Sequence, residues 1–416
     1  MGKKWFVVTV AVLMLVLVSM GPASAQQSGP IEMEGVLHGA AYKIRVPENW
    51  NGVLLLYAHG YPKEPVPDPD AAFLGEAAET QLLDAGYALA ASGFRGAGYN
   101  VREGMWDTKK LLTFFRSEIG RPQHVILYGI SMGGVVALKS IEKHPNLYDA
   151  AVPMCTLGGG ATKSFDHKLD YALAYDVVFG WPETWGTVDD VRDDIEFYGE
   201  VWFPKVYDEV FDPANYAKWE FIRRVTGTSI GGYYSYDGAM PMPPAVVAMS
   251  YFMTQQQAEI EVRAGGKVRQ NVDRIYSLSA DDKVFLKSFG LPVEAWLAEM
   301  NTRTIYEADP NARRYLERYG DYSGKIKVPV LMVHNTEDSV TDVSYTADYL
   351  ETVQDAGRED LLVRAYSSLP GHCNFTVPQM LHVFEATVDW LESGIPPADD
   401  DFPTDLGFEP GYSPEQ

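Results

Sequence analysis

Basic residues are scarce in this chain: 34 lysines and arginines stand against 57 aspartates and glutamates, and the formal net charge is −23. So acidic a protein repels the phosphates of nucleic acids and anionic lipid surfaces, and neither is expected as a partner. Histidines are few, and six of them show no ligand-like spacing with Asp, Glu or Cys: His38, His124, His144, His167, His334 and His382. We therefore expect no catalytic metal and no cofactor.

Apolar runs that approach the length of a membrane span are lacking apart from residues 5–18. That run is shorter than the roughly 20 residues that a span needs, and no cysteine follows it that could carry a lipid. Lys3 and Lys4 precede the run, and Ala23 and Ala25 occupy the small-residue positions of a signal-peptidase site. The pattern predicts a signal peptide over residues 1–25, cleaved after Ala25, and a secreted or periplasmic protein without a stable membrane anchor.

The remaining composition is that of a globular protein with a sizeable core, with 46% apolar and 22% charged residues. A length of 416 residues predicts one large domain with an insertion, or two smaller domains. Residues 26–156 alternate short apolar runs with helical patterns, which indicates βαβ units and a mostly parallel, doubly wound α/β sheet. Strand patterns lie at 42–47, 52–60, 87–93, 124–129 and 148–155, and helical patterns at 70–86, 108–120 and 132–144.

The alternation stops at residue 157 and returns at about 326. The intervening stretch is rich in aromatic residues and holds five of the nine tryptophans: Trp181, Trp185, Trp202, Trp219 and Trp296. Its recurring helical patterns predict a mainly helical insertion over 157–325. The sheet core resumes over 326–394, and the acidic segment 395–416, rich in proline and glycine, is predicted to be a flexible tail.

Ser131 lies in the pentapeptide Gly129-Ile130-Ser131-Met132-Gly133, between an expected buried strand and an expected helix. A sharp strand-to-helix turn brings the backbone close to itself, which explains a glycine on both sides of the serine. The hydroxyl is then exposed at a helix N-terminus, where negative charge is favoured. We interpret Ser131 as a nucleophile; the alternative is a tight turn that contains a polar residue.

A serine nucleophile needs a base, and the base needs an orienting acid. Two loops that follow later strands offer these groups. Glu337 and Asp338 follow the strand pattern at 328–334, and His372 follows the one at 361–368.

With these motifs the sequence resembles the α/β-hydrolase superfamily over about residues 31–156 and 326–394. The insertion lies where that superfamily commonly carries its cap, between the sixth and seventh strands. The chain order Ser, Asp, His also agrees. The resemblance implies Ser131 as nucleophile, Asp338 as acid and His372 as base, with Glu337 as the alternative acid.

The stretch His59-Gly60-Tyr61-Pro62 is similar to the H-G-x-P motif of this superfamily. The resemblance implies that the backbone N–H groups of Tyr61 and Met132 form the oxyanion hole. Gly60 would permit the turn, and His59 would support the loop from beneath.

Cys155 ends the strand after the nucleophile helix, and Cys373 follows His372, so both are expected at the carboxyl edge of the sheet. We hypothesise a disulfide between them, with two buried thiols as the alternative. The stretch 371–376, GHCNFT, is similar to the segment around the catalytic histidine of tannases and feruloyl esterases. In those enzymes a cysteine before the nucleophile pairs with one after the histidine. Here Ile130 precedes Ser131 instead.

These features predict a secreted serine hydrolase that cleaves carboxylic esters through an acyl-enzyme. The substrate would be a small-molecule or polymer-derived ester, and the aromatic-rich cap favours one with an apolar or aromatic group. The alternative is a serine peptidase or amidase of the prolyl-peptidase type, because amides are cleaved by the same triad. A non-catalytic binding protein agrees less well, since every element of the site is present. The sequence does not indicate an oligomeric state.

Overall fold

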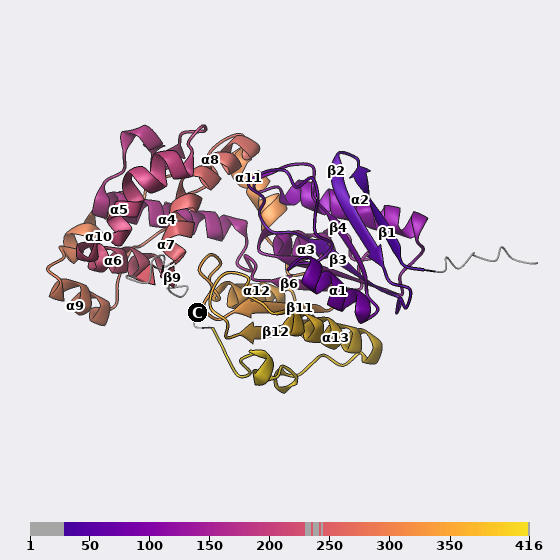
Figure 1. The fold of residues 1–416 in the computed structure, drawn as a ribbon. Coiled ribbons are helices and arrows are strands. Elements are labelled where there is room, and N and C mark those ends of the chain that lie inside the picture. Colours follow the sequence, from indigo (N-terminus) through magenta and orange to yellow (C-terminus); the bar gives the residue numbers. More distant parts are fainter. Residues whose placement is uncertain (1–28, 229–233, 236–240, 243, 415–416) are drawn as a thin grey trace, which may run out of the picture.

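The computed structural model describes residues 29–228, 234–235, 241–242 and 244–414, so the predicted signal peptide lies outside the described residues. An eight-stranded sheet with the order β1-β2-β4-β3-β5-β6-β11-β12 forms its centre (Figure 1). From β4 to β12, each strand runs parallel to the next strand in this order. Strand β2 is antiparallel to both β1 and β4. The strands are β1 (Ile31–Leu37), β2 (Ala40–Val46), β3 (Val53–Ala58), β4 (Ala88–Ser92), β5 (His124–Ile130), β6 (Ala150–Met154), β11 (Val330–Asn335) and β12 (Leu362–Ser367).

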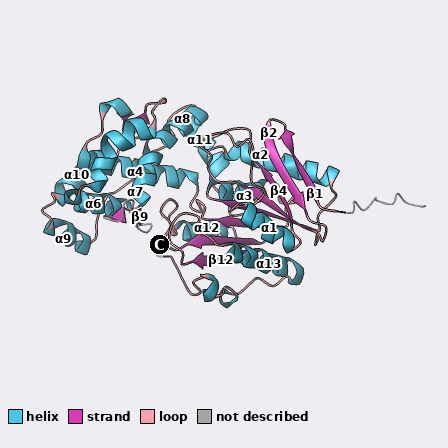
Figure 2. Cartoon of the chain, viewed as in Figure 1, coloured by secondary structure: helices cyan, strands magenta, loops and turns pink. Residues whose placement is uncertain are grey.

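Strand β3 explains why the central strands are continuous apolar runs, since all of its side chains are buried. Successive side chains of a strand point to opposite faces. Leu55 and Tyr57 pack with helices α1 and α13, whereas Leu54 and Leu56 pack with α2, α3 and α12. The sheet is therefore covered on both faces (Figure 2), as a buried parallel sheet requires. These helices are α1 (Glu76–Asp84), α2 (Val101–Glu118), α3 (Met132–Lys143), α12 (Tyr345–Asp355) and α13 (Val377–Ser393).

The chain between β6 and β11 forms a mainly helical cap to one side of the sheet (Figure 1). The cap has its own apolar core, in which Trp185, Trp202 and Trp219 are buried. This confirms the predicted α/β sheet with a helical insertion between its sixth and seventh strands. The cap helices are α4 (Ala161–Phe179), a π-helical segment (Phe197–Val206), α5 (Tyr207–Phe211), α6 (Tyr216–Thr226), α7 (Pro244–Met253), α8 (Gln255–Ala264), α9 (Ala280–Ser288), α10 (Val293–Thr302) and α11 (Pro310–Gly320). Short antiparallel pairs are formed by β7 (Gly186–Thr187) with β8 (Asp190–Val191) and by β9 (Tyr234–Ser235) with β10 (Pro241–Met242).

Two helix boundaries differ from the sequence patterns. Helix α1 begins at Glu76 rather than near residue 70, because Leu74 and Gly75 both have positive φ angles, of 71° and 65°. Such angles lie outside the right-handed helical region. Helix α2 begins at Val101, seven residues before the pattern at 108–120, and Gly104 there packs closely against Val136 and Phe94.

The C-terminal segment 395–414 also differs from the flexible tail that its composition predicts. Phe402 and Phe408 are buried in the same apolar cluster as α1 and α13. The backbone N–H of Ser368 donates to the carbonyl of Gly407 at 3.0 Å, and Ser367 forms a β-bridge with Phe408. Two aromatic anchors thus hold an otherwise acidic and proline-rich segment against the core.

No helix within the described part of the chain is long and apolar enough to cross a membrane.

Candidate active site

Ser131 occupies a strained turn between β5 and α3, with φ 52° and ψ −122°. A left-handed φ at a residue with a side chain costs on the order of 1–3 kcal/mol and is common at functional sites. The flanking glycines permit the turn for steric reasons. A Cβ atom on Gly129 would lie 2.2 Å from the carbonyl oxygen of Gly133, and one on Gly133 would lie 1.9 Å from that of Ala58. No other residue fits at either position without a shift of the backbone.

The structure brings Ser131, His372 and Asp338 together at the carboxyl edge of the sheet. His372, in the loop after β12, has its Nε2 atom 2.9 Å from the Ser131 hydroxyl oxygen. Its Nδ1 atom lies 2.8 and 2.9 Å from the two carboxylate oxygens of Asp338, in the loop after β11. An N–H on Nδ1 donates to the carboxylate, so the lone pair on Nε2 accepts from the serine hydroxyl. This arrangement is able to remove a proton from Ser131.

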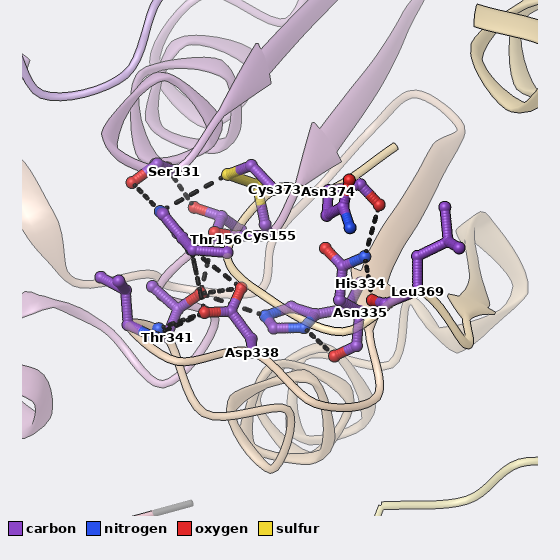
Figure 3. A network of polar contacts seen from close by, with 12 residues as sticks. Ser131, Cys155, Thr156, His334, Asn335, Asp338, Thr341, Leu369, Cys373 and Asn374 are labelled. Atoms are coloured by element: carbon purple, nitrogen blue, oxygen red, sulfur yellow. Dashed lines mark hydrogen bonds and ion pairs between the residues drawn. A yellow bond between two sulfur atoms is a disulfide. The ribbon is translucent and has the colours of Figure 1, made fainter. Parts of the chain in front are cut away.

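Asp338 is held as a buried carboxylate. Its Oδ1 atom accepts from the backbone N–H groups of Val340 at 2.7 Å and Thr341 at 2.8 Å. Its Oδ2 atom accepts from the Thr341 hydroxyl at 3.0 Å (Figure 3). Burial raises the pKa of Asp338, but the charge and hydrogen bonds of His372, together with His334 and Thr341, outweigh it and lower the pKa below its usual value. Asp338 is therefore ionised at neutral pH and orients the imidazole of His372.

The alternative acid, Glu337, does not occupy this position. Its side chain is exposed, and its backbone carbonyl accepts from the N–H of Gly371 at 2.7 Å. Among the two neighbouring carboxylates, the geometry selects Asp338.

The loop that contains His59, Gly60 and Tyr61 lies directly beside Ser131. A Cβ atom on Gly60 would lie 3.5 Å from the Cβ of Ser131. The His59 ring packs against Phe94 at 4.0 Å between centroids, and its Nδ1 atom lies 2.7 Å from the carbonyl oxygen of Gly60. Burial lowers the pKa of His59, which favours a neutral ring under the loop. The oxyanion roles of the Tyr61 and Met132 N–H groups stay predictions.

Cys155 and Cys373 form a disulfide with 5.3 Å between their Cα atoms, as hypothesised (Figure 3). Cys155 directly follows Met154, the residue that pairs with Ile130 across β5 and β6. Cys155 therefore directly follows the end of β6, the strand beside β5. The bridge ties the His372 loop to the end of β6. It also consumes the two thiols of the one group of candidate metal ligands in the described chain, Cys155 with His372 and Cys373.

Three further residues support the site and were not predicted. The Thr341 hydroxyl lies 3.0 Å from the carbonyl oxygen of Cys155, and that of Thr156 donates to the carbonyl of Ser131 at 2.9 Å. The side-chain amide of Asn335 donates to Leu369 and Asn374, which flank His372 (Figure 3). These contacts with Cys155, Ser131 and the His372 loop could not be predicted, because each of them joins residues that are remote along the chain.

The side chain of Tyr61 joins the loop that contains His59, Gly60 and Tyr61 to the cap. Its hydroxyl lies 2.9 Å from that of Tyr251 on α7 and is hydrogen-bonded to the carboxylate of Glu259 on α8. Burial raises the pKa of Glu259, with Tyr61 among the groups that oppose the rise. Two cap helices therefore contact the loop that lies beside Ser131.

The strand order with an antiparallel second strand, the strained serine turn after the fifth strand, and the helical cap after the sixth define the α/β-hydrolase fold. The chain therefore adopts this fold. No family model matches its sequence. A curated relative, o-phthalyl amidase from Xanthobacter agilis, is 23% identical over 402 aligned residues, and the match covers 86% of each chain.

Solved structures with a similar fold include two esterases from Aspergillus oryzae. One is described as an esterase, at 16% identity and a TM-score of 0.43 over 88% of this chain and 80% of that one. The other is feruloyl esterase B, at 14% identity and a TM-score of 0.42 over 88% and 81%. Acylaminoacyl peptidase from Pyrococcus horikoshii matches at 11% identity and a TM-score of 0.41, with 87% of this chain but 41% of the peptidase covered. Because these TM-scores lie below 0.5, the fold assignment rests on the strand order.

Proposed function

We propose that the protein is a serine hydrolase that cleaves carboxylic esters through an acyl-enzyme on Ser131. The single observation that carries this proposal is the continuous hydrogen-bonded series from Ser131 through His372 to the buried carboxylate of Asp338. Such a series is the arrangement that activates a serine hydroxyl, which is a weak nucleophile on its own.

In the first half-reaction, Ser131 Oγ attacks the ester carbonyl while His372 Nε2 takes the hydroxyl proton. Asp338 stabilises the imidazolium that forms, since it is a carboxylate held 2.8 Å from Nδ1. The backbone N–H groups of Tyr61 and Met132 stabilise the negative oxygen of the tetrahedral intermediate, a contribution of about 3–4 kcal/mol for one donor. The C–O bond then breaks, and the leaving alcohol takes the proton from His372.

In the second half-reaction, water attacks the acyl-enzyme, and His372 takes one of its protons. Collapse of the second tetrahedral intermediate returns that proton to Ser131 and releases the carboxylic acid. The net reaction consumes one ester and one water and yields one acid and one alcohol.

The cap supports a substrate with an apolar or aromatic group. Tyr61 is edge-on to Tyr251 with 6.1 Å between ring centroids, and Tyr251 in turn contacts Phe197 and Phe252. Aromatic side chains therefore gather where the cap meets the loop of Tyr61, and aromatic surroundings favour flat or apolar acyl groups.

An active-site label tests the mechanism. We expect a fluorophosphonate to label the wild type at Ser131, and the Ser131→Ala variant not to be labelled. Ser393→Ala, which removes an exposed serine at the end of α13, is the matched control and should label fully. A wild type that does not react, or equal labelling of Ser131→Ala, would contradict the proposal.

Cleavage of amides is the second candidate, because the curated relative that matches 86% of this chain is an amidase. Matched pairs of substrates with the same acyl group, a p-nitrophenyl ester and a p-nitroanilide, separate the two. A kcat/KM for the ester at least 100-fold above that for the anilide, beyond the difference in their uncatalysed rates, favours the esterase. Comparable values favour the amidase. Benzoyl and butyryl series of both test the preference for an aromatic group.

We also propose that the protein is exported. The disulfide between Cys155 and Cys373 supports this, since such bonds persist in oxidising compartments. Sequencing of the N-terminus of the mature protein tests the expected cleavage after Ala25.

A further inference from the structure

A cavity of about 560 Å³ lies where helices α2 and α11 meet the C-terminal end of α3. Its lining includes Arg102, Trp106, Lys143, His144 and Tyr319. The volume is within the usual range for small-molecule sites. Ser131 precedes the other end of α3, and the 12 residues of that helix separate the two places by roughly 18 Å. This cavity is therefore distinct from the candidate active site.

Positive charges gather around one wall of the cavity. The ring of Tyr319 has Lys143 Nζ 4.6 Å from its centroid, and the guanidinium carbons of Arg318 and Arg102 at 5.5 and 5.8 Å. Throughout the described residues, none of these three cations forms an ion pair with a carboxylate. Each of them instead makes a cation–π contact with the ring of Tyr319.

The nearby carboxylates are already engaged with other cations. Glu103, which also lines the cavity, pairs with Arg263 on α8 at 3.0 Å. Asp107 is buried and pairs with Arg95 at 2.7 Å. The cationic wall is thus left without internal neutralisation.

The positive charges in and around this wall act on the pKa values of Lys143 and His144. Burial, Lys139 and Arg318 lower the pKa of Lys143, and burial, Lys109 and Lys143 lower the pKa of His144. The carboxyl end of α3 offsets part of this repulsion, since a helix C-terminus favours positive charge. A local excess of positive charge is nonetheless unusual on a chain with a formal charge of −23.

The cavity also offers apolar surface for a flat group. Trp106 is 50% exposed, Lys110 lies 5.1 Å above its ring centroid, and Met105 contributes to the lining. We propose that this cavity binds a small organic anion with an aromatic ring, its anionic group between Arg102 and Lys143 and its ring against Trp106 or Tyr319. This second site is independent of the proposed hydrolase activity.

Calorimetric titration with three probes tests the proposal: 2-naphthoate, 2-naphthyl phosphate and the neutral 2-naphthamide. Ser131 is first blocked with a fluorophosphonate, or replaced by alanine should the label not react, so that binding at the active site is excluded. We expect at least one anion to bind with a Kd below about 1 mM and at least tenfold more tightly than the amide. The anion with the lower Kd identifies the preferred head group.

Variants assign the binding to the cavity. Arg102→Gln and Lys143→Gln should each raise the Kd of the preferred anion at least fivefold, whereas Lys325→Gln, an exposed lysine outside the cavity, should leave it unchanged. Unaltered melting temperatures show that the variants are folded. The proposal is overturned if neither anion binds, if the amide binds equally well, or if the cavity variants bind like Lys325→Gln.

Discussion

Replacement of Lys168 by methionine should stabilise the cap at neutral pH. Lys168 lies on α4 and is 5% exposed. Its ammonium group lies 4.2 Å from the ring centroid of Phe165 and 4.9 Å from that of Phe252, and donates to the side chain of Gln256 at 3.3 Å. No carboxylate among the described residues pairs with it. Burial, assisted by the nearby Arg269, lowers the pKa of Lys168 to about 7.

The sign and size of the effect follow from this lowered pKa. The unfolded chain keeps Lys168 protonated up to the ordinary pKa of 10.5, whereas the folded protein releases the proton near pH 7. The buried ammonium therefore destabilises the fold fully below pH 7, and the penalty is lost as pH rises towards 10.5. At about 1.4 kcal/mol per pKa unit, the penalty amounts to about 5 kcal/mol at pH 6 and about 1 kcal/mol at pH 9.5. The variant also loses the hydrogen bond to Gln256, which reduces its gain in the free energy of unfolding by about 1 kcal/mol.

Thermal melting of wild type and Lys168→Met at pH 6 and pH 9.5 measures this difference. The variant should melt at least about 3 °C higher at pH 6, and the two proteins should melt within about 1 °C of each other at pH 9.5. Lys163→Met, which removes a half-exposed lysine of the same helix paired with Asp348, should change little at either pH. An equal or lower melting temperature of Lys168→Met at pH 6, or an advantage independent of pH, would refute the reasoning.

Three further changes probe the candidate site. Asp338→Asn, which no longer holds the imidazole of His372 in the required tautomer, should lower kcat about 10⁴-fold in ester hydrolysis; a loss below tenfold would contradict the role of the acid. Glu259→Gln weakens the hold of the cap on Tyr61 and should lower kcat about tenfold while fluorophosphonate labelling persists; unchanged kcat would mean that the cap contact does not position the oxyanion loop. Cys155→Ser opens a loop of 218 residues and should lower stability by up to about 5 kcal/mol, and reductant should then lower the melting temperature of the wild type but not of the variant.

The buried strands and the serine turn could be predicted because their physical causes are local. Strand β3 must be apolar on both faces, so its pattern is visible in a few residues. The turn at Ser131 needs Gly129 and Gly133, because any larger residue would collide with backbone. Strand β1 was missed for the opposite reason: it is an edge strand whose Glu32 is exposed, and its pattern is weakly apolar.

The supporting contacts could not be predicted, since they depend on how distant segments meet. Phe402 and Phe408 anchor a segment whose composition is that of a tail. The Tyr61 hydroxyl contacts Tyr251 on α7 and Glu259 on α8, which lie 190 and 198 residues later in the chain. From the sequence we predicted a role only for its backbone N–H.

The sequence by itself determined the α/β class, the helical insertion and the turn that presents Ser131, because periodicity and steric fit at glycine act over short stretches. The order of Ser131, Asp338 and His372 along the chain was also visible in it. Only the tertiary structure decided that Asp338 rather than Glu337 meets His372, and that Cys155 is joined to Cys373. It also created the cationic cavity between α2, α3 and α11. Those outcomes depend on distances of a few ångströms between residues far apart in the chain, and such distances exist only once the sheet has folded.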